Sequence, residues 1–145
     1  MPSSSRQRLT LWAGRTAACL FLAAAAAQLA LAAGLLPATI AWGGTQRLRT
    51  RQTILASVGA ATVLLGMAGT VHRRAATASP GATLRAASWI VALYMILNTL
   101  GNFLSTSPME RYVFGSATLV MAAASLIVAC SQVGDEQGTY QSLDE

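Results

Sequence analysis

The sequence has no lysine and no acidic residue before Glu110. Charged residues make up 10% of the chain, whereas they make up about a quarter of an ordinary soluble domain. The ten arginines lie at the ends of long uncharged runs and do not gather into one basic surface. This distribution excludes an ordinary soluble domain, and it leads us to expect no nucleic acid among the partners of the protein.

Histidine and cysteine are also scarce. His72 is the single histidine, and Cys19 and Cys130 are far apart in the sequence. Zinc sites use several such ligands at close spacing, and thiol–disulfide redox proteins place two cysteines close together. We therefore expect no metal site, no cofactor and no redox role, and we expect both cysteines to act as small apolar residues that face other helices.

What the sequence does have is four long uncharged runs, of 31, 21, 24 and 23 residues. A helix crosses the hydrocarbon core of a bilayer with about 20 mostly apolar residues. The predicted fold class is therefore all-α, a four-helix transmembrane bundle within residues 16–133. A basic N-terminal segment (1–15) precedes this membrane domain, and an acidic tail (134–145), which we expect to be disordered, follows it. The predicted helices cover about residues 16–40, 53–71, 86–104 and 112–129.

The basic start before the first apolar run also fits a secretory signal. The run is longer than the apolar core of such a signal, which has about 7–15 residues. This length favours an uncleaved helix over a cleaved signal.

The arginines also predict an orientation. The N-terminal segment and the second loop hold six of them, and the first and third loops hold four. Cytoplasmic loops carry the excess of arginine in membrane proteins. The count favours a multi-pass protein of the cell membrane with both termini in the cytoplasm, and the reversed topology is the alternative.

The connection between the third and fourth predicted helices is short, so these helices must form an antiparallel hairpin. Its sequence predicts a capping box, with Ser107 as N-cap, Pro108 in the first helical position and Glu110 reaching back to the cap. Arg111 is then placed to meet phosphate headgroups, and Trp42, after the first helix, suits the same level of the membrane.

Polar residues within the predicted helices are the best candidates for a site. Asn98, Gly101, Asn102 and Ser105 share one face of the third helix by their spacing, and Gln28 lies near the middle of the first. One interpretation is hydrogen bonding between helices, worth about 0.6 kcal/mol per bond in membranes, with Gly101 allowing close contact. The other is a polar ligand pocket in the outer half of the bundle. We favour the first interpretation.

Small residues predict where helices pack closely in lipid. The second helix carries three glycines among alanines and serines, and the fourth carries a stripe of small residues that is typical of a packing surface. These residues are Gly59, Gly66 and Gly69 in the second helix, and Thr118, Ala122, Ser125 and Ala129 in the fourth.

Two stretches in a fixed order resemble a group of small bacterial four-helix integral membrane proteins of uncharacterised function. The first stretch surrounds Gln28 and Trp42, and the second surrounds Asn98, Asn102 and the pair Glu110-Arg111. The resemblance implies the same four-helix topology and no activity. The matching residues are 27–34, Pro37, 41–44 and Leu48-Arg49 in the first stretch, and Asn98, Asn102, Ser105, Ser107, Glu110-Arg111 and 115–129 in the second.

No predicted span contains an acidic residue, which argues against a proton-coupled transporter. No nucleophile–base pair, phosphate-binding loop or metal motif is present, so we do not expect an enzyme. The leading hypothesis is a non-enzymatic interaction or accessory subunit that contacts membrane lipids and either a second copy or a partner membrane protein. The alternative is binding or transport of a small molecule or lipid through the polar pocket.

Overall fold

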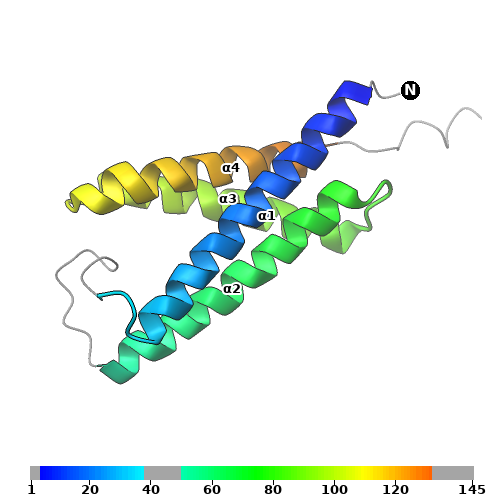
Figure 1. Cartoon of the computed structure of the whole chain (residues 1–145). Helices are drawn as coiled ribbons and strands as arrows, with labels where there is room; N and C mark the ends of the chain where they lie inside the picture. Colours follow the sequence, from blue (N-terminus) through cyan, green and yellow to red (C-terminus); the bar gives the residue numbers. More distant parts are fainter. Residues whose placement is uncertain (1–3, 38–49, 132–145) are drawn as a thin grey trace, which may run out of the picture.

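Residues 4–37 and 50–131 are described by the computed structural model, in which they form helices and short turns. The helices are α1 (Ser4–Ala32), α2 (Thr50–Ala76), α3 (Ala82–Leu104) and α4 (Gly115–Cys130), and α4 continues a π-helical segment, η3 (Met109–Phe114). The four spans, with η3 and α4 counted as one, are each long and apolar enough to cross a membrane. The predicted fold class, an all-α four-helix bundle, is confirmed (Figure 1).

Most helix ends differ from the prediction, although α3 ends at Leu104 as predicted. α1 begins at Ser4, so residues 4–15 are not a separate segment but the first turns of the first helix, with Arg6, Arg8 and Arg15 exposed on its surface. α2 also extends beyond the predicted 53–71 at both ends. Charged residues mark the edge of the hydrocarbon core, whereas a helix continues through the headgroup layer where its polar side chains are solvated. Trp42 and the acidic tail (134–145) lie outside the described residues.

The end of α1 is set by Gly34 and not by Pro37. Gly34 has φ +73°, which side chains other than glycine rarely adopt. Its N–H donates to the carbonyl of Leu31 (3.1 Å), and the N–H of Leu35 donates to the carbonyl of Ala30 (2.9 Å). These two bonds form a Schellman motif, which satisfies the last carbonyls of the helix. The predicted end near Ile40 is therefore wrong, because a glycine had already stopped the helix.

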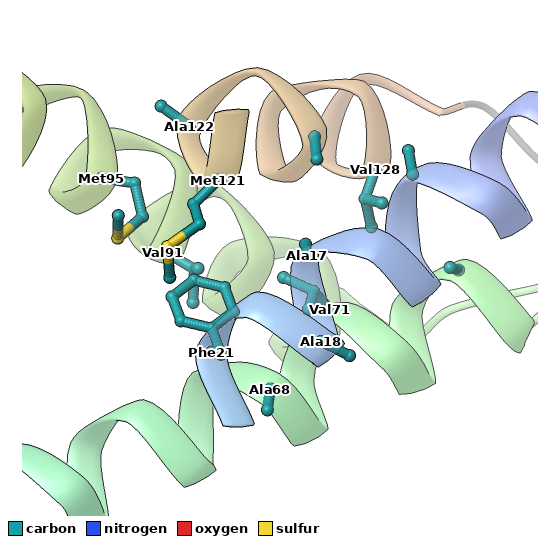
Figure 2. Close-up of a cluster of buried hydrophobic side chains, with 13 residues drawn as sticks. Ala17, Ala18, Phe21, Ala68, Val71, Val91, Met95, Met121, Ala122 and Val128 are labelled. Atoms are coloured by element: carbon teal, nitrogen blue, oxygen red, sulfur yellow. The ribbon is translucent and has the colours of Figure 1, made fainter. Parts of the chain in front are cut away.

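The bundle consists of two helical hairpins, α1–α2 and α3–α4, that cross near the beginning of α1 and diverge toward their other ends (Figure 1). The buried apolar cluster lies at this crossing. Phe21 reaches from α1 toward Val91 of α3 and Met121 of α4 (Figure 2). The cluster comprises Ala13, Ala17, Ala18, Phe21, Ala68, Val71, Ala75, Val91, Met95, Met121, Ala122, Ala124 and Val128. Beyond it, each hairpin is held together only by its own two helices.

The closest approach of two helices is at Gly14. A Cβ atom placed on Gly14 would lie 2.4 Å from Cβ of Ala75 in α2 and 3.7 Å from Cγ2 of Val128 in α4. Three helices therefore meet at a position where only a hydrogen atom fits.

The glycines of α2 do not have the predicted role. A Cβ atom on Gly59, Gly66 or Gly69 would have no atom of another helix within 4 Å. None of these glycines therefore lies at a close contact between helices, because a pattern of small residues does not show where a neighbouring helix approaches.

Arg74 joins the end of α2 to the end of α4. Its side chain is 3% exposed, and its Nη2 donates a hydrogen bond to the carbonyl oxygen of Ser131, directly after α4. The last carbonyls of a helix lack partners within the helix and carry its negative dipole end, so a guanidinium is stabilising there. Arg74 therefore fixes the relative position of the two hairpins at the crossing.

Replacing Gly14 by alanine tests the close approach of α1 and α2. The new methyl group would overlap that of Ala75, and overpacking of this kind costs about 1–3 kcal/mol. We expect Gly14→Ala to lower the free energy of unfolding, measured by titration with a denaturing detergent and followed by circular dichroism. The double variant Gly14→Ala/Ala75→Gly moves the methyl group to the other helix and should recover most of the loss. Gly66→Ala, at an uncrowded site, should be tolerated. Equal stability of Gly14→Ala and Gly66→Ala would contradict this packing.

Candidate functional site

The predicted polar residues lie on different hairpins. Gln28 belongs to α1 and comes two turns after Phe21, the last α1 residue of the buried cluster, whereas Asn98 and Asn102 belong to α3. Gln28 and Asn98 are not hydrogen bonded to each other, and Oε1 of Gln28 is buried without a partner among the described residues. The structure therefore does not bring the three carboxamides together around one space.

Asn102 makes a hydrogen bond between helices. Its Nδ2 donates to Oγ1 of Thr118 in α4, at 3.3 Å. The hydroxyl of Thr118 donates in turn to the carbonyl of Phe114, at 2.8 Å, so its lone pair is available to accept from Asn102. This bond fixes the register of the α3–α4 hairpin.

Asn98, one turn before Asn102, is half-buried and has no hydrogen bond within the described part of the chain. The expectation that Gly101 allows a close contact is wrong, because a Cβ atom there would meet no neighbour within 4 Å. The tight contact of this hairpin is instead between Gly115 and the ring of Phe103, whose Cε1 would lie 3.0 Å from a Cβ at position 115.

Ser105 belongs to the turn after α3 and does not share the face of Asn98 and Asn102, because α3 ends at Leu104. Its Oγ accepts from the N–H of Ser107 (3.1 Å) and donates to Oε2 of Glu110. The hydroxyl of Ser107 accepts from the N–H of Glu110 (3.5 Å), which is one half of the predicted capping box. The Ser105 hydroxyl also connects Glu110 to this cap, because it donates to the Glu110 carboxylate and accepts from the Ser107 N–H. The guanidinium of Arg111 donates to the carbonyl of Ser105 (2.9 Å) and so also closes the turn.

The small-residue stripe of α4 is a packing surface, since Thr118, Ala122, Ser125 and Ala129 are all buried. The prediction that the cysteines are packed against other helices is wrong, because Cys19 and Cys130 are both exposed free thiols. Among residues 4–37 and 50–131, no three His, Cys, Asp or Glu side chains lie close enough to hold a metal ion.

An open groove of about 510 Å³ runs between α1 and α2, and none of the predicted site residues lines it. Four of its residues come from α1 and four from α2: Arg15, Ala18, Cys19, Leu22, Leu65, Ala68, Gly69 and His72. Each set of four has the spacing i, i+3, i+4, i+7, which defines one face of a helix. Both spacings can be read from the sequence. They indicate a groove only once the structure shows that the two helix faces lie side by side.

No family model, curated protein or solved structure matches this chain.

A double-mutant cycle tests the bond between Asn102 and Thr118. We expect Asn102→Leu and Thr118→Val each to lower the free energy of unfolding, with a coupling energy of about 0.6 kcal/mol, the average for hydrogen bonds between membrane helices. Asn98→Leu is the matched control, and it should cost less than Asn102→Leu because it breaks no hydrogen bond. A coupling energy of zero would show that the two side chains do not interact.

Proposed function

We propose that the protein is a non-enzymatic, multi-pass protein of the cell membrane that acts as an interaction or accessory subunit, by binding transmembrane helices of a second copy or of a partner. The observation that carries this proposal is the divergence of the two hairpins (Figure 1). The buried cluster joins the four helices at one end only, so the other ends of the hairpins are open to a further helix between or beside them.

The composition of the interior also supports association. Eleven of the eighteen buried hydrophobic residues among those described are alanines. Small side chains let helices approach closely and leave little enclosed volume, which suits packing and does not suit a passage for a substrate.

The competing hypothesis is ligand binding or transport through a pocket lined by Gln28, Asn98 and Asn102. It has less support, because Gln28 lies on one hairpin and the two asparagines lie on the other. The amide of Asn102 is already used in the bond to Thr118.

Both termini are proposed to face the cytoplasm. The first turn of α1 and the last turn of α4 lie at the same end of the bundle (Figure 1), as an even number of spans requires. Arg6, Arg8, Arg73, Arg74 and Arg85 are at this end, together with Arg15, and cytoplasmic ends carry the excess of arginine.

Photo-crosslinking in native membranes tests the association. A photoreactive amino acid at Leu100 of α3 or Leu55 of α2, both exposed and outside the buried cluster, should give a protein adduct of defined mass. The same probe at Trp12, which is exposed at the crossing end, is the control and should give lipid adducts only. Lipid adducts alone from all three positions would contradict the proposal, and mass spectrometry of the adduct distinguishes a second copy from another protein.

Reporter fusions test the orientation. Alkaline phosphatase is active only outside the cytoplasm, so a fusion after Thr106, between α3 and η3, should be active. A fusion after Glu145 should be inactive. The opposite pattern would establish the reversed topology.

A further inference from the structure

The groove between α1 and α2 has an apolar floor and a cationic end. We refer to its small apolar residues Ala18, Ala68 and Gly69 as its floor. Leu22 and Leu65 also line it, two turns along their helices from Arg15 and His72. A Cβ atom on Gly69 would have no neighbour within 4 Å, so this part of the floor is open. The volume of about 510 Å³ falls within the range of about 300–1,000 Å³ that is usual for sites of small ligands.

Arg15 and His72 lie together at the other end of the groove. Both are exposed, and neither makes a hydrogen bond within the described part of the chain. Arg15 is the last charged residue before the uncharged run of α1, and His72 closes the uncharged run of α2. Both side chains therefore lie where the hydrocarbon core of the bilayer ends, at the depth of the lipid headgroups.

The described part of the chain places no carboxylate at this end of the groove. Glu110 is the only acidic residue among residues 4–37 and 50–131, and it lies in η3, at the opposite end of the α3–α4 hairpin. A second copy that packed into the groove would thus bring no carboxylate to Arg15 from its helices. A membrane lipid with a negative headgroup supplies both an apolar chain for the floor and an anion for the guanidinium.

We propose that this groove binds one anionic phospholipid, with an acyl chain along Ala18, Ala68 and Gly69 and the headgroup phosphate at Arg15. His72 has an imidazole N–H that can donate a second hydrogen bond to the same phosphate. The site rests on the membrane location proposed above, but it does not depend on association with another protein.

Native mass spectrometry of the full-length protein, released from mild detergent, tests the site. The protein is incubated with phosphatidylglycerol or with phosphatidylcholine of the same acyl chains. Wild type should retain one phosphatidylglycerol in preference to phosphatidylcholine. Arg15→Gln should lower that preference about fivefold, since one arginine near the membrane surface is worth about that factor for an anionic lipid. Gly69→Leu should fill the floor and reduce the retention of both lipids.

Two matched variants control for changes in lipid retention that do not arise in the groove. Arg8→Gln removes an exposed arginine of α1 outside the groove, and Gly66→Leu adds the same side chain at an equally open glycine of α2 that does not line it. Both should bind phosphatidylglycerol as wild type does.

Three results would overturn the proposal. The first is equal retention of the two lipids by wild type, and the second is an equal effect of Gly69→Leu and Gly66→Leu. The third is a Cys19–Cys19 disulfide between two copies that forms under oxidation and that phosphatidylglycerol does not suppress, because Cys19 lines the groove and a second copy would then occupy it. Extraction of the membranes with alkaline carbonate separates these failures from a failure of the membrane location, since only the latter would release the protein.

Discussion

The contact between Gly14 and Ala75 is the constraint on which the other contacts depend. It lets the backbones of α1 and α2 touch at the crossing, and Val128 of α4 packs against the same point. In a bilayer the helices gain little from expelling water, so such close packing supplies much of the free energy of association. The contact of Gly14 with Ala75 therefore lies beside both the buried apolar cluster and the buried guanidinium of Arg74, and together they join the two hairpins.

The number of helices and their approximate positions could be predicted. Charged side chains are costly in hydrocarbon, so each apolar span appears in the sequence as a long uncharged run. Their ends could not be read in the same way. Gly34 ends α1 through backbone conformation, and the first turns of α1 are helical although they carry arginines. Gly14 and Gly34 have structural roles that were not predicted, whereas Gly59 was predicted to lie at a helix contact and does not, since the residue type does not reveal which face another helix covers.

The candidate site was predicted in part for a related reason. The bond between Asn102 and Thr118 follows from local hairpin geometry, which a short connection imposes. The separation of Gln28 from the asparagines follows from the angle between two hairpins, and no short-range pattern encodes that angle. The groove needs the side-by-side placement of two faces on α1 and α2, although each face has a regular helical spacing. The sequence therefore did not reveal how the helices are aligned with one another in pairs, and that alignment determines which polar residues and faces meet.

The bond from Arg74 to Ser131 joins residues that lie 57 positions apart in the chain. The donor belongs to the first hairpin and the acceptor follows the last described helix, so the ribosome makes the acceptor long after the donor. This contact between the hairpins can therefore form only once α4 has been synthesised, and α1 and α2 must pack against each other before it is available.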